Sequence, residues 1–157
     1  MNYILSDGNH REDLFPFTFT RPVAEIRVGI LTISEKWEKW LNAPVSHQTE
    51  AYLSEKFPLT VAAENTVING SYLPNESLVE AINGLKMGEA LIGDDSYIAY
   101  VTEDLETGFE ESGYTAVPFD GEVLTVKHTW DIFSNNAAAL QADFDVITKG
   151  RTSQPIS

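Results

Sequence analysis

The sequence predicts one mixed α/β domain with a mainly parallel central sheet flanked by helices. In the first half of the chain, short apolar runs with strand character alternate with segments of helical period, as expected of parallel strands joined by helices. In the second half, strand-like runs follow one another directly, which indicates hairpins at one side of the sheet. With 157 residues, 43% of them hydrophobic, the chain can bury one core of this kind.

The first elements are a strand and a capped helix. Residues 2–6 are a short apolar run and predict a buried strand. Two prolines within residues 15–22 exclude a regular helix there. Thr32 and Glu35 then have the spacing of a capping box and predict a helix that ends near residues 42–44. Its apolar face consists of Ile33, Trp37, Trp40 and Leu41.

The middle of the chain predicts a further helix, two short strands and another capped helix. A helix over residues 49–57 would begin at a threonine and end before a proline, with Tyr52, Leu53 and Phe57 facing inward. Residues 59–63 and 66–69 are rich in strand-forming side chains. Asn75 predicts the start of a helix that ends before Gly88. Its buried side would consist of Leu78, Val79, Ile82 and Leu85.

The last third predicts four strands and a final helix. The strand-like runs are residues 89–92, 97–102, 114–119 and 122–126. Between the first two, Asp94 and Asp95 indicate a solvated turn rather than a cation site. Asp131 is interpreted as the cap of a helix that ends at Gly150. The predicted buried face of this helix is Ile132, Phe133, Ala137, Leu140 and Phe144.

Composition excludes several classes of function. The chain has no cysteine, so disulfides, thiolate metal sites and thiol catalysis are excluded, and a cytoplasmic location is expected. No stretch approaches the roughly 20 apolar residues of a membrane span. A formal charge of −14 argues against nucleic acid and anionic membranes as partners. The histidines, His10, His47 and His128, lack the spacing of metal ligands and are interpreted as ordinary structural or exposed residues.

The loop over residues 7–11 is the candidate ligand site. It follows the first strand, and ligands of open α/β sheets bind outside the carboxyl ends of strands. Backbone N–H groups around Gly8 and Asn9 could hold a phosphate, and Arg11, Arg21 and Arg27 lie close to them in the sequence. The alternative interpretation is a turn glycine with surface arginines, because neither a dinucleotide fingerprint nor a P-loop motif is present.

The same residues resemble a known family. Residues 4–8, Ile-Leu-Ser-Asp-Gly, followed by Arg11 and by Arg21 before a proline, are similar to the opening of sugar nucleotidyltransferases, in which a strand ends in L-A-x-G-x-G-T-R and a Lys-Pro follows. Residues 17–31 resemble a divergent group described as N-acetylglucosamine-1-phosphate uridyltransferase-like. Later motifs of that group resemble residues 67–74, 129–133 and 150–151.

The resemblance implies a reduced Rossmann-like domain of the nucleotide-diphospho-sugar transferase type, related to UDP-N-acetylglucosamine pyrophosphorylase. It implies that Gly8 and Asn9 approach the nucleotide, that Arg11 contacts the triphosphate and that Arg21 replaces the family lysine. The rest of the expected nucleotide-binding set is Arg27, Asn69 and Gly70. The implied partners are a nucleotide and a sugar phosphate, whose oxygen would attack the α-phosphorus while Mg²⁺ helps pyrophosphate to leave.

Departures from the family pattern leave a second interpretation open. Ser71 stands where active members usually have a magnesium-binding aspartate, and the loop lacks the second glycine and its following threonine. The chain is therefore interpreted as a nucleotidyltransferase-like domain that binds an NTP or nucleotide-sugar and transfers a nucleotidyl group, or as a non-catalytic degenerate module; a protein-interaction domain without a small ligand is the third alternative. The degenerate module would bind a nucleotide-sugar or scaffold an attached acyltransferase-like domain.

The chain end predicts a linker. Residues 1–150 are expected to form the nucleotidyltransferase-like domain, and residues 151–157 have no core-forming pattern. Members of the group that the chain resembles typically continue into a left-handed β-helix of hexapeptide repeats. The resemblance therefore implies a linker to such a domain, and a homo-oligomer formed through it.

Overall fold

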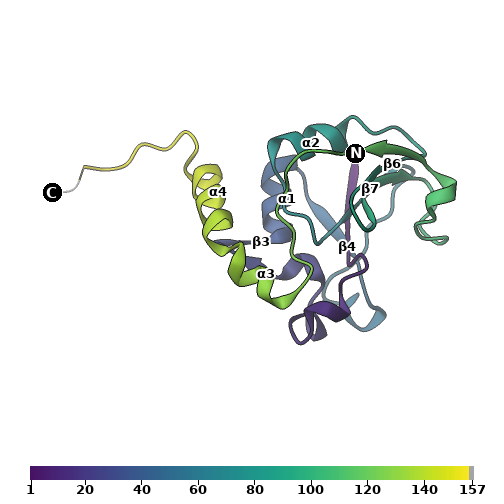
Figure 1. The fold of residues 1–157 in the computed structure, drawn as a ribbon, viewed down its shortest axis with the longest axis horizontal. Coiled ribbons are helices and arrows are strands. Elements are labelled where there is room, and N and C mark those ends of the chain that lie inside the picture. The colour runs from purple at the N-terminus through teal and green to yellow at the C-terminus, as the bar shows by residue number, and fades with distance from the viewer. Residues whose placement is uncertain (156–157) are drawn as a thin grey trace.

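The computed structural model describes residues 1–155 and contains a six-stranded sheet of order β4-β1-β5-β7-β6-β8 (Figure 1). In that order the strands are β4 (Val45–Gln48), β1 (Asn2–Ser6), β5 (Asn65–Asn69), β7 (Tyr97–Thr102), β6 (Glu89–Ile92) and β8 (Thr115–Pro118). β1 is parallel to both of its neighbours and β6 is parallel to β8, whereas β7 is antiparallel to β5 and β6. The predicted mixed, mainly parallel sheet is confirmed.

The two faces of the sheet are covered differently. Side chains alternate along a strand, so Leu5 and Ile4 of β1 belong to different cores. Leu5 lies in the larger core, to which α1 (Ile33–Leu41) and α2 (Glu76–Asn83) contribute. Ile4 lies in a smaller aromatic core with Tyr97, Tyr100, Phe109 and Tyr114. Because β1 is buried on both faces, the position of its carboxyl end is well defined.

Short pieces connect these elements. A two-stranded hairpin of β2 (Arg27–Val28) and β3 (Leu31–Thr32) precedes α1. The region predicted to lack a regular helix, residues 15–22, contains one 3-10 turn, Phe17–Phe19, and two more, Glu12–Leu14 and Val23–Glu25, flank it. A further 3-10 turn, Glu111–Gly113, precedes β8.

The capping box of α1 is present as predicted. The Thr32 hydroxyl accepts from the Glu35 N–H at 3.2 Å, and the Glu35 carboxylate accepts from the Thr32 N–H at 3.1 Å. The helix ends at Leu41, and its C-cap residue, Asn42, has a left-handed backbone with φ 51°. Trp37 is fully buried and its indole N–H donates to the Tyr72 carbonyl at 3.0 Å. Both local capping and burial therefore fix the position of α1 against the core.

The segment between α1 and β5 differs from the prediction. The helix predicted over residues 49–57 is wrong: one 3-10 turn, Ala51–Leu53, forms, and Tyr52 is 62% exposed rather than inward. The hydroxyl of Thr49 does not cap a helix, because it donates to the Asp7 carboxylate at 2.6 Å. The strand predicted at residues 59–63 is also wrong. β4 was not predicted, because its Val-Ser-His-Gln sequence lacks the apolar character of a buried strand.

Two predictions in the second half also need correction. The strand predicted at residues 122–126 is reduced to one bridge between Tyr72 and Thr125, since this segment pairs with a loop rather than a strand. The hairpin pattern holds for β6 and β7, but β8 joins the far side of β6 in parallel instead of pairing with β7. The helix predicted from Asn75 is α2, and it ends at Asn83.

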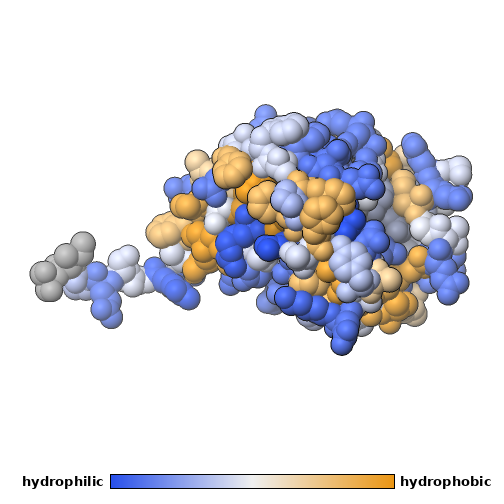
Figure 2. Space-filling view, turned by 90° about the horizontal axis from the view of Figure 1, so that it is seen from below, coloured by the Kyte–Doolittle hydropathy of each residue, from blue (hydrophilic) through white to orange (hydrophobic). Residues whose placement is uncertain are grey.

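The C-terminal helices, α3 (Thr129–Ser134) and α4 (Asn136–Thr148), lie beside α1 and the β2–β3 hairpin, away from the sheet (Figure 1). The predicted burial of Phe133, Leu140 and Phe144 is wrong, because they are 75%, 46% and 53% exposed, and Ala137 is also exposed. Figure 2 shows apolar atoms on the side from which the C-terminal segment leaves.

Within residues 1–155 no helix has the length and apolar character needed to cross a bilayer. Positions 156–157 of the predicted linker lie outside the described residues.

A buried ion pair attaches α4 to the domain. One oxygen of Asp143 accepts hydrogen bonds from the N–H groups of Ile30 and Leu31, each at 3.0 Å, and from the Lys36 ammonium. The ammonium also donates to the Val28 carbonyl at 2.7 Å. Burial lowers the pKa of Lys36, and the charge of Asp143 offsets part of this effect. The face of α4 that docks is therefore the one that carries Ala139 and Asp143, not the one with the largest apolar side chains.

Candidate functional site at the carboxyl ends of β1 and β5

Two glycines bring the loops after β1 and β5 into close contact. Gly8 is left-handed with φ 62°, and a Cβ there would lie 2.4 Å from the side-chain oxygen of Asn69. The N–H of Gly70 donates to the Ser6 carbonyl at 2.8 Å, and a Cβ on Gly70 would lie 2.8 Å from the same oxygen. A larger residue would separate the loops. The predicted site residues Gly8, Asn69 and Gly70 thus lie together at the edge where ligands of open α/β sheets bind.

The loop after β1 presents free backbone donors next to a cavity. Within residues 1–155, the N–H groups of Gly8, Asn9 and His10 donate no hydrogen bond. A cavity of about 320 Å³ adjoins them, lined by Asp7, Gly8, Asn9, Arg11, Glu12, Asp13 and Glu50. Consecutive N–H groups around a glycine can hold an anion. The four carboxylates of the lining oppose a bare phosphate, so an accompanying cation would favour its binding.

Arg11 lines this cavity, and its guanidinium is held in place by neighbouring groups. It donates to the Tyr52 hydroxyl at 2.6 Å and to the Thr18 carbonyl at 3.2 Å. The guanidinium also lies 3.8 Å from the Glu50 carboxylate and 3.9 Å from that of Asp7. Burial raises the pKa of Asp7, although hydrogen bonds from Thr49 and from the backbone oppose this. The arrangement orients Arg11 toward the cavity edge and leaves it partly neutralised.

The other two predicted arginines do not line this cavity. Arg21 is exposed and makes no hydrogen bond or ion pair with the described part of the chain, residues 1–155. Arg27, on β2, donates to the Ile30 carbonyl and lies 3.7 Å from the Glu35 carboxylate. Neither lines the cavity beside Gly8. The structure therefore brings Arg11 to the candidate site and does not gather all three guanidinium groups in one cleft.

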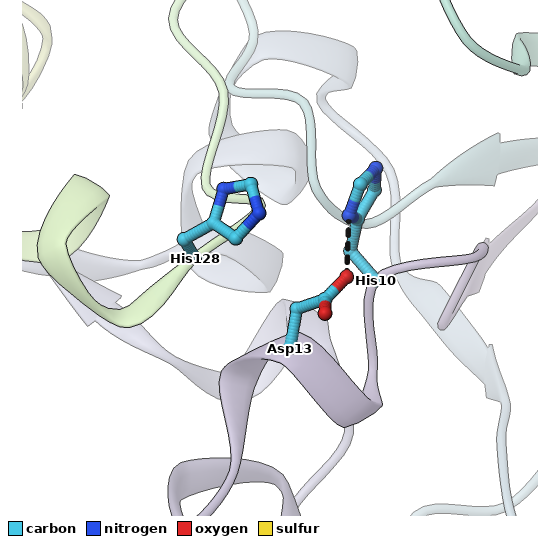
Figure 3. Close-up of side chains that lie close together, drawn as sticks. All are labelled: His10, Asp13 and His128. Carbon is cyan, nitrogen blue, oxygen red and sulfur yellow. Dashed lines mark hydrogen bonds and ion pairs between the residues drawn. The ribbon is translucent and has the colours of Figure 1, made fainter.

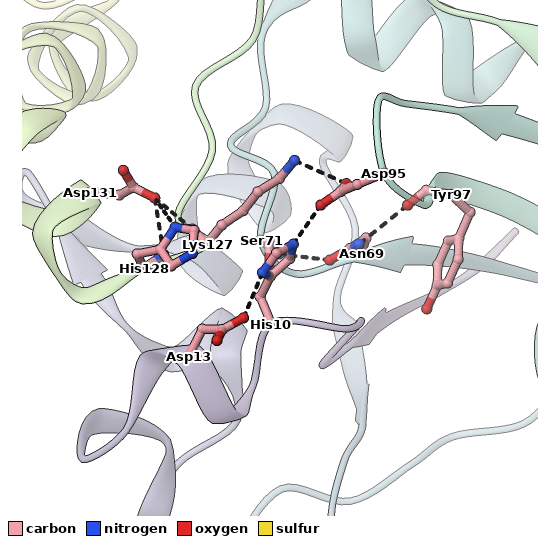
Figure 4. A network of polar contacts seen from close by, with 9 residues as sticks. All are labelled: His10, Asp13, Asn69, Ser71, Asp95, Tyr97, Lys127, His128 and Asp131. Atoms are coloured by element: carbon pink, nitrogen blue, oxygen red, sulfur yellow. Dashed lines mark hydrogen bonds and ion pairs between the residues drawn. The ribbon is translucent and has the colours of Figure 1, made fainter.

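Ser71 occupies the position at which the family resemblance implies a magnesium ligand. Its side chain is fully buried, and the hydroxyl has no hydrogen-bond partner among residues 1–155. The N–H of Ser71 donates to the side chain of Asn69 at 3.0 Å (Figure 4). Mg²⁺ binds mainly through carboxylates and water, and a single neutral hydroxyl does not supply such a site. The residues at this position therefore do not fit Mg²⁺.

A polar network beside Ser71 was missed by the sequence analysis (Figure 4). The Nε2 atom of His10 lies 2.7 Å from one oxygen of Asp95, and the Lys127 ammonium donates to the other oxygen at 3.0 Å. Burial acts to raise the pKa of Asp95, but the hydrogen bonds from His10 and Lys127 outweigh it and lower the pKa. His10 and Asp95 are 85 positions apart, so no local pattern could reveal their contact.

A second cavity of about 690 Å³ adjoins this network. Lys127, Tyr72 and Asp94 line it together with residues of the segment between β8 and α3. The ammonium of Lys127 lies 5.4 Å from the centre of the Tyr72 ring. This cavity has polar and apolar walls and the size of a small-molecule site. Lys127 is the basic residue that it shares with the network.

The fold is that of an open α/β domain, and its candidate site consists of glycine-containing loops at the carboxyl ends of the parallel strands β1 and β5. The model of a family described as sugar nucleotidyl transferase matches residues 3–152. The chain therefore belongs to the sugar nucleotidyl transferase family. A search of curated proteins gives no match to this sequence.

Solved structures with the same fold are distant in sequence. One is a protein described as a glucose-1-phosphate thymidylyltransferase from Bacillus anthracis, in complex with a sucrose; it is 13% identical, with a TM-score of 0.53 over 89% of this chain and 95% of that chain. Another is the inositol-1-phosphate CTP transferase from T. maritima, 13% identical, with a TM-score of 0.50 over 97% of this chain and 98% of that chain. At this identity the likeness shows the fold alone.

Proposed function

We propose that this chain binds an NTP or a nucleotide-sugar at the carboxyl ends of β1 and β5, as a domain related to UDP-N-acetylglucosamine pyrophosphorylases. The observation that carries the proposal is the contact of Gly8 with Asn69, which leaves consecutive N–H groups of the β1 loop free beside a cavity. These donors suit the phosphates of a nucleotide. Membership of the sugar nucleotidyl transferase family supports the same ligand class.

The proposed roles follow from the contacts. Gly8 and Asn9, which are exposed, would let the nucleotide approach the backbone, whereas the buried Gly70 keeps the loop after β5 against Ser6. Arg11 would contact phosphate at the cavity edge, and Arg21, which is exposed, would reach phosphate once a ligand is bound. Arg27 would contribute only by leaving its Glu35 partner. If the domain transfers a nucleotidyl group, an oxygen of the hexose 1-phosphate attacks the α-phosphorus, and the bond to pyrophosphate breaks.

Calorimetric titration of the chain with UTP, dTTP and UDP-N-acetylglucosamine, each with and without a divalent cation, tests the ligand class. We expect saturable heat with at least one of the three, and tighter binding with the cation because four carboxylates line the cavity. Absence of heat with every ligand under both conditions contradicts the proposed nucleotide site.

A second candidate function, a non-catalytic binding or scaffolding module, is favoured by Ser71. Without a carboxylate at that position the chain lacks the charge that would bind a catalytic Mg²⁺ there. Pyrophosphate release from a panel of NTPs and sugar 1-phosphates separates the two candidates. For the non-catalytic module we expect nucleotide binding without release above the protein-free control. Sustained turnover by the purified chain would exclude this second candidate.

A further inference from the structure

Three potential metal ligands meet beside the candidate nucleotide site, although the sequence predicted no metal role for the histidines. They are His10 from the loop after β1, Asp13 from the following 3-10 turn, and His128 from the residue before α3 (Figure 3). One ligand atom of each lies within 4.8 Å of the others, and His10 Nδ1 is 3.0 Å from an oxygen of Asp13. The cluster does not include Ser71, the residue at the position of the expected Mg²⁺.

The spacing of these atoms fits a small divalent ion. Zinc-like ions lie about 2.0–2.1 Å from imidazole nitrogen and about 2.0–2.2 Å from carboxylate oxygen, which places tetrahedral ligand atoms about 3.3 Å apart. The contact between His10 and Asp13 is already close to this separation. A small side-chain rotation of His128 would suffice, and Figure 3 shows a nitrogen of its ring facing His10.

His10 is oriented as a metal ligand. A neutral imidazole carries one N–H, yet both ring nitrogens of His10 face carboxylate oxygens, at 2.7 Å from Asp95 and 3.0 Å from Asp13. If Nε2–H donates to Asp95, the lone pair of Nδ1 points toward Asp13, where a cation would bind both atoms. Metal-bound histidines commonly donate their other N–H to a carboxylate in this way. Lys127 fixes that carboxylate through its second oxygen.

His128 is also held in position. Its ring stacks on Trp130, with ring centres 4.4 Å apart and an interplanar angle of 3°. It meets the His10 ring edge to face at 5.7 Å. The Asp131 carboxylate accepts hydrogen bonds from the backbone N–H groups of Lys127 and His128, each at 3.0 Å, and so fixes the start of α3. The ligands therefore come from opposite ends of the chain, and both histidines are held by contacts of their own.

We infer that His10, Asp13 and His128 form a binding site for a divalent transition ion of the zinc class. Two imidazoles and one carboxylate suit Zn²⁺, Co²⁺ or Ni²⁺ better than Mg²⁺, which prefers oxygen ligands. The side chains are 13%, 49% and 38% exposed, so at least one coordination position would stay open to solvent or to a ligand. Asp13 also lines the acidic cavity beside Gly8, so the ion would place positive charge at that edge.

Titration of the metal-free, untagged chain tests this site without any nucleotide, so its outcome is independent of the proposed function. We expect one equivalent of Co²⁺ to bind with visible absorption bands, Zn²⁺ to displace it, and Mg²⁺ at the same concentration to leave the spectrum unchanged.

His10→Ala, Asp13→Asn and His128→Ala should each weaken Zn²⁺ binding at least tenfold, since each removes one of three protein ligands. Asp95→Asn should weaken it as well, by about tenfold, through loss of the partner of His10.

Asp120→Asn is the matched control, because Asp120 is exposed and outside the cluster; its Zn²⁺ affinity should equal that of the wild type. Circular dichroism and thermal melting of each variant establish that it is folded. If His10→Ala does not fold, Asp13→Asn and His128→Ala decide the question, since both side chains are substantially exposed. Wild-type Zn²⁺ affinity in these two variants, or binding of Mg²⁺ as tight as that of Zn²⁺, overturns the inference.

Discussion

Replacing Asp143 with alanine is expected to lower the free energy of unfolding by about 3–5 kcal/mol, because it leaves the buried Lys36 ammonium without its counter-charge. The substitution also leaves the N–H groups of Ile30 and Leu31 without their acceptor. Both side chains of the pair are less than a tenth exposed, at 4% for Lys36 and 7% for Asp143, so solvent cannot replace the lost contacts. Urea unfolding followed by tryptophan fluorescence and circular dichroism measures the effect.

Asp145→Ala on the same helix is the control for this substitution. Asp145 is exposed, and its polar contact in the described structure is with Gln141 one helical turn away. Its loss should cost less than about 0.5 kcal/mol. The double variant Lys36→Met with Asp143→Ala should regain part of the stability lost in Asp143→Ala, because no unpaired charge stays buried. Equal stability of the Asp143→Ala and Asp145→Ala variants would show that the ion pair does not anchor α4.

Gly8→Ala is expected to lower the affinity for whichever nucleotide the chain binds by at least tenfold and to destabilise the fold by about 2–4 kcal/mol. The left-handed backbone costs an alanine about 1–2 kcal/mol, and the added methyl would overlap the Asn69 side chain. Asn69 cannot easily move away, because it donates to the Tyr97 carbonyl at 3.2 Å and accepts from the Ser71 N–H. Titration calorimetry and urea unfolding report the two effects separately.

Gly108→Ala separates backbone strain from the site. Gly108 has φ 72°, close to that of Gly8, but nothing lies within 4 Å of the position of its Cβ. The Gly108→Ala substitution should therefore lower the free energy of unfolding by about 1–2 kcal/mol through backbone strain, and it should leave the nucleotide affinity unchanged. If Gly8→Ala and Gly108→Ala bind nucleotide equally well, the packing of Gly8 on Asn69 does not shape the ligand site.

Elements with strong local signals were predictable from the sequence. The capping residues of α1 and α2 hydrogen-bond within three positions, so Thr32 and Asn75 mark helix starts without reference to the rest of the fold. β1 is buried on both faces and reads as a continuous apolar run. The place of the following glycine loop after β1 predicts a ligand site, and the family resemblance adds Asn69 and Gly70; these residues lie together in the structure.

Other features depend on partners that are distant in the sequence. β4 has a polar sequence and forms because the backbone of β1 offers it a parallel edge. β8 pairs with β6 rather than β7, a choice between two available strands that no local pattern encodes. The apolar residues of α4 suggested burial of Leu140 and Phe144, whereas the buried ion pair of Asp143 turns the side of the helix with Ala139 and Asp143 inward.

The sequence by itself determined the fold class and the glycine loop after the first strand, because alternating apolar periods, caps and turn residues act over a few positions. The family followed from the resemblance of its motifs. Only the tertiary structure decided which charged residues meet. Arg21 and Arg27, close to Arg11 in sequence, do not line the cavity beside Gly8, whereas His10 meets Asp95 and His128 across the length of the chain. The physical reason is that the side chains at this edge of the sheet come from several different loops. The order of the strands sets where these loops lie, and strand order is a property of the whole sheet.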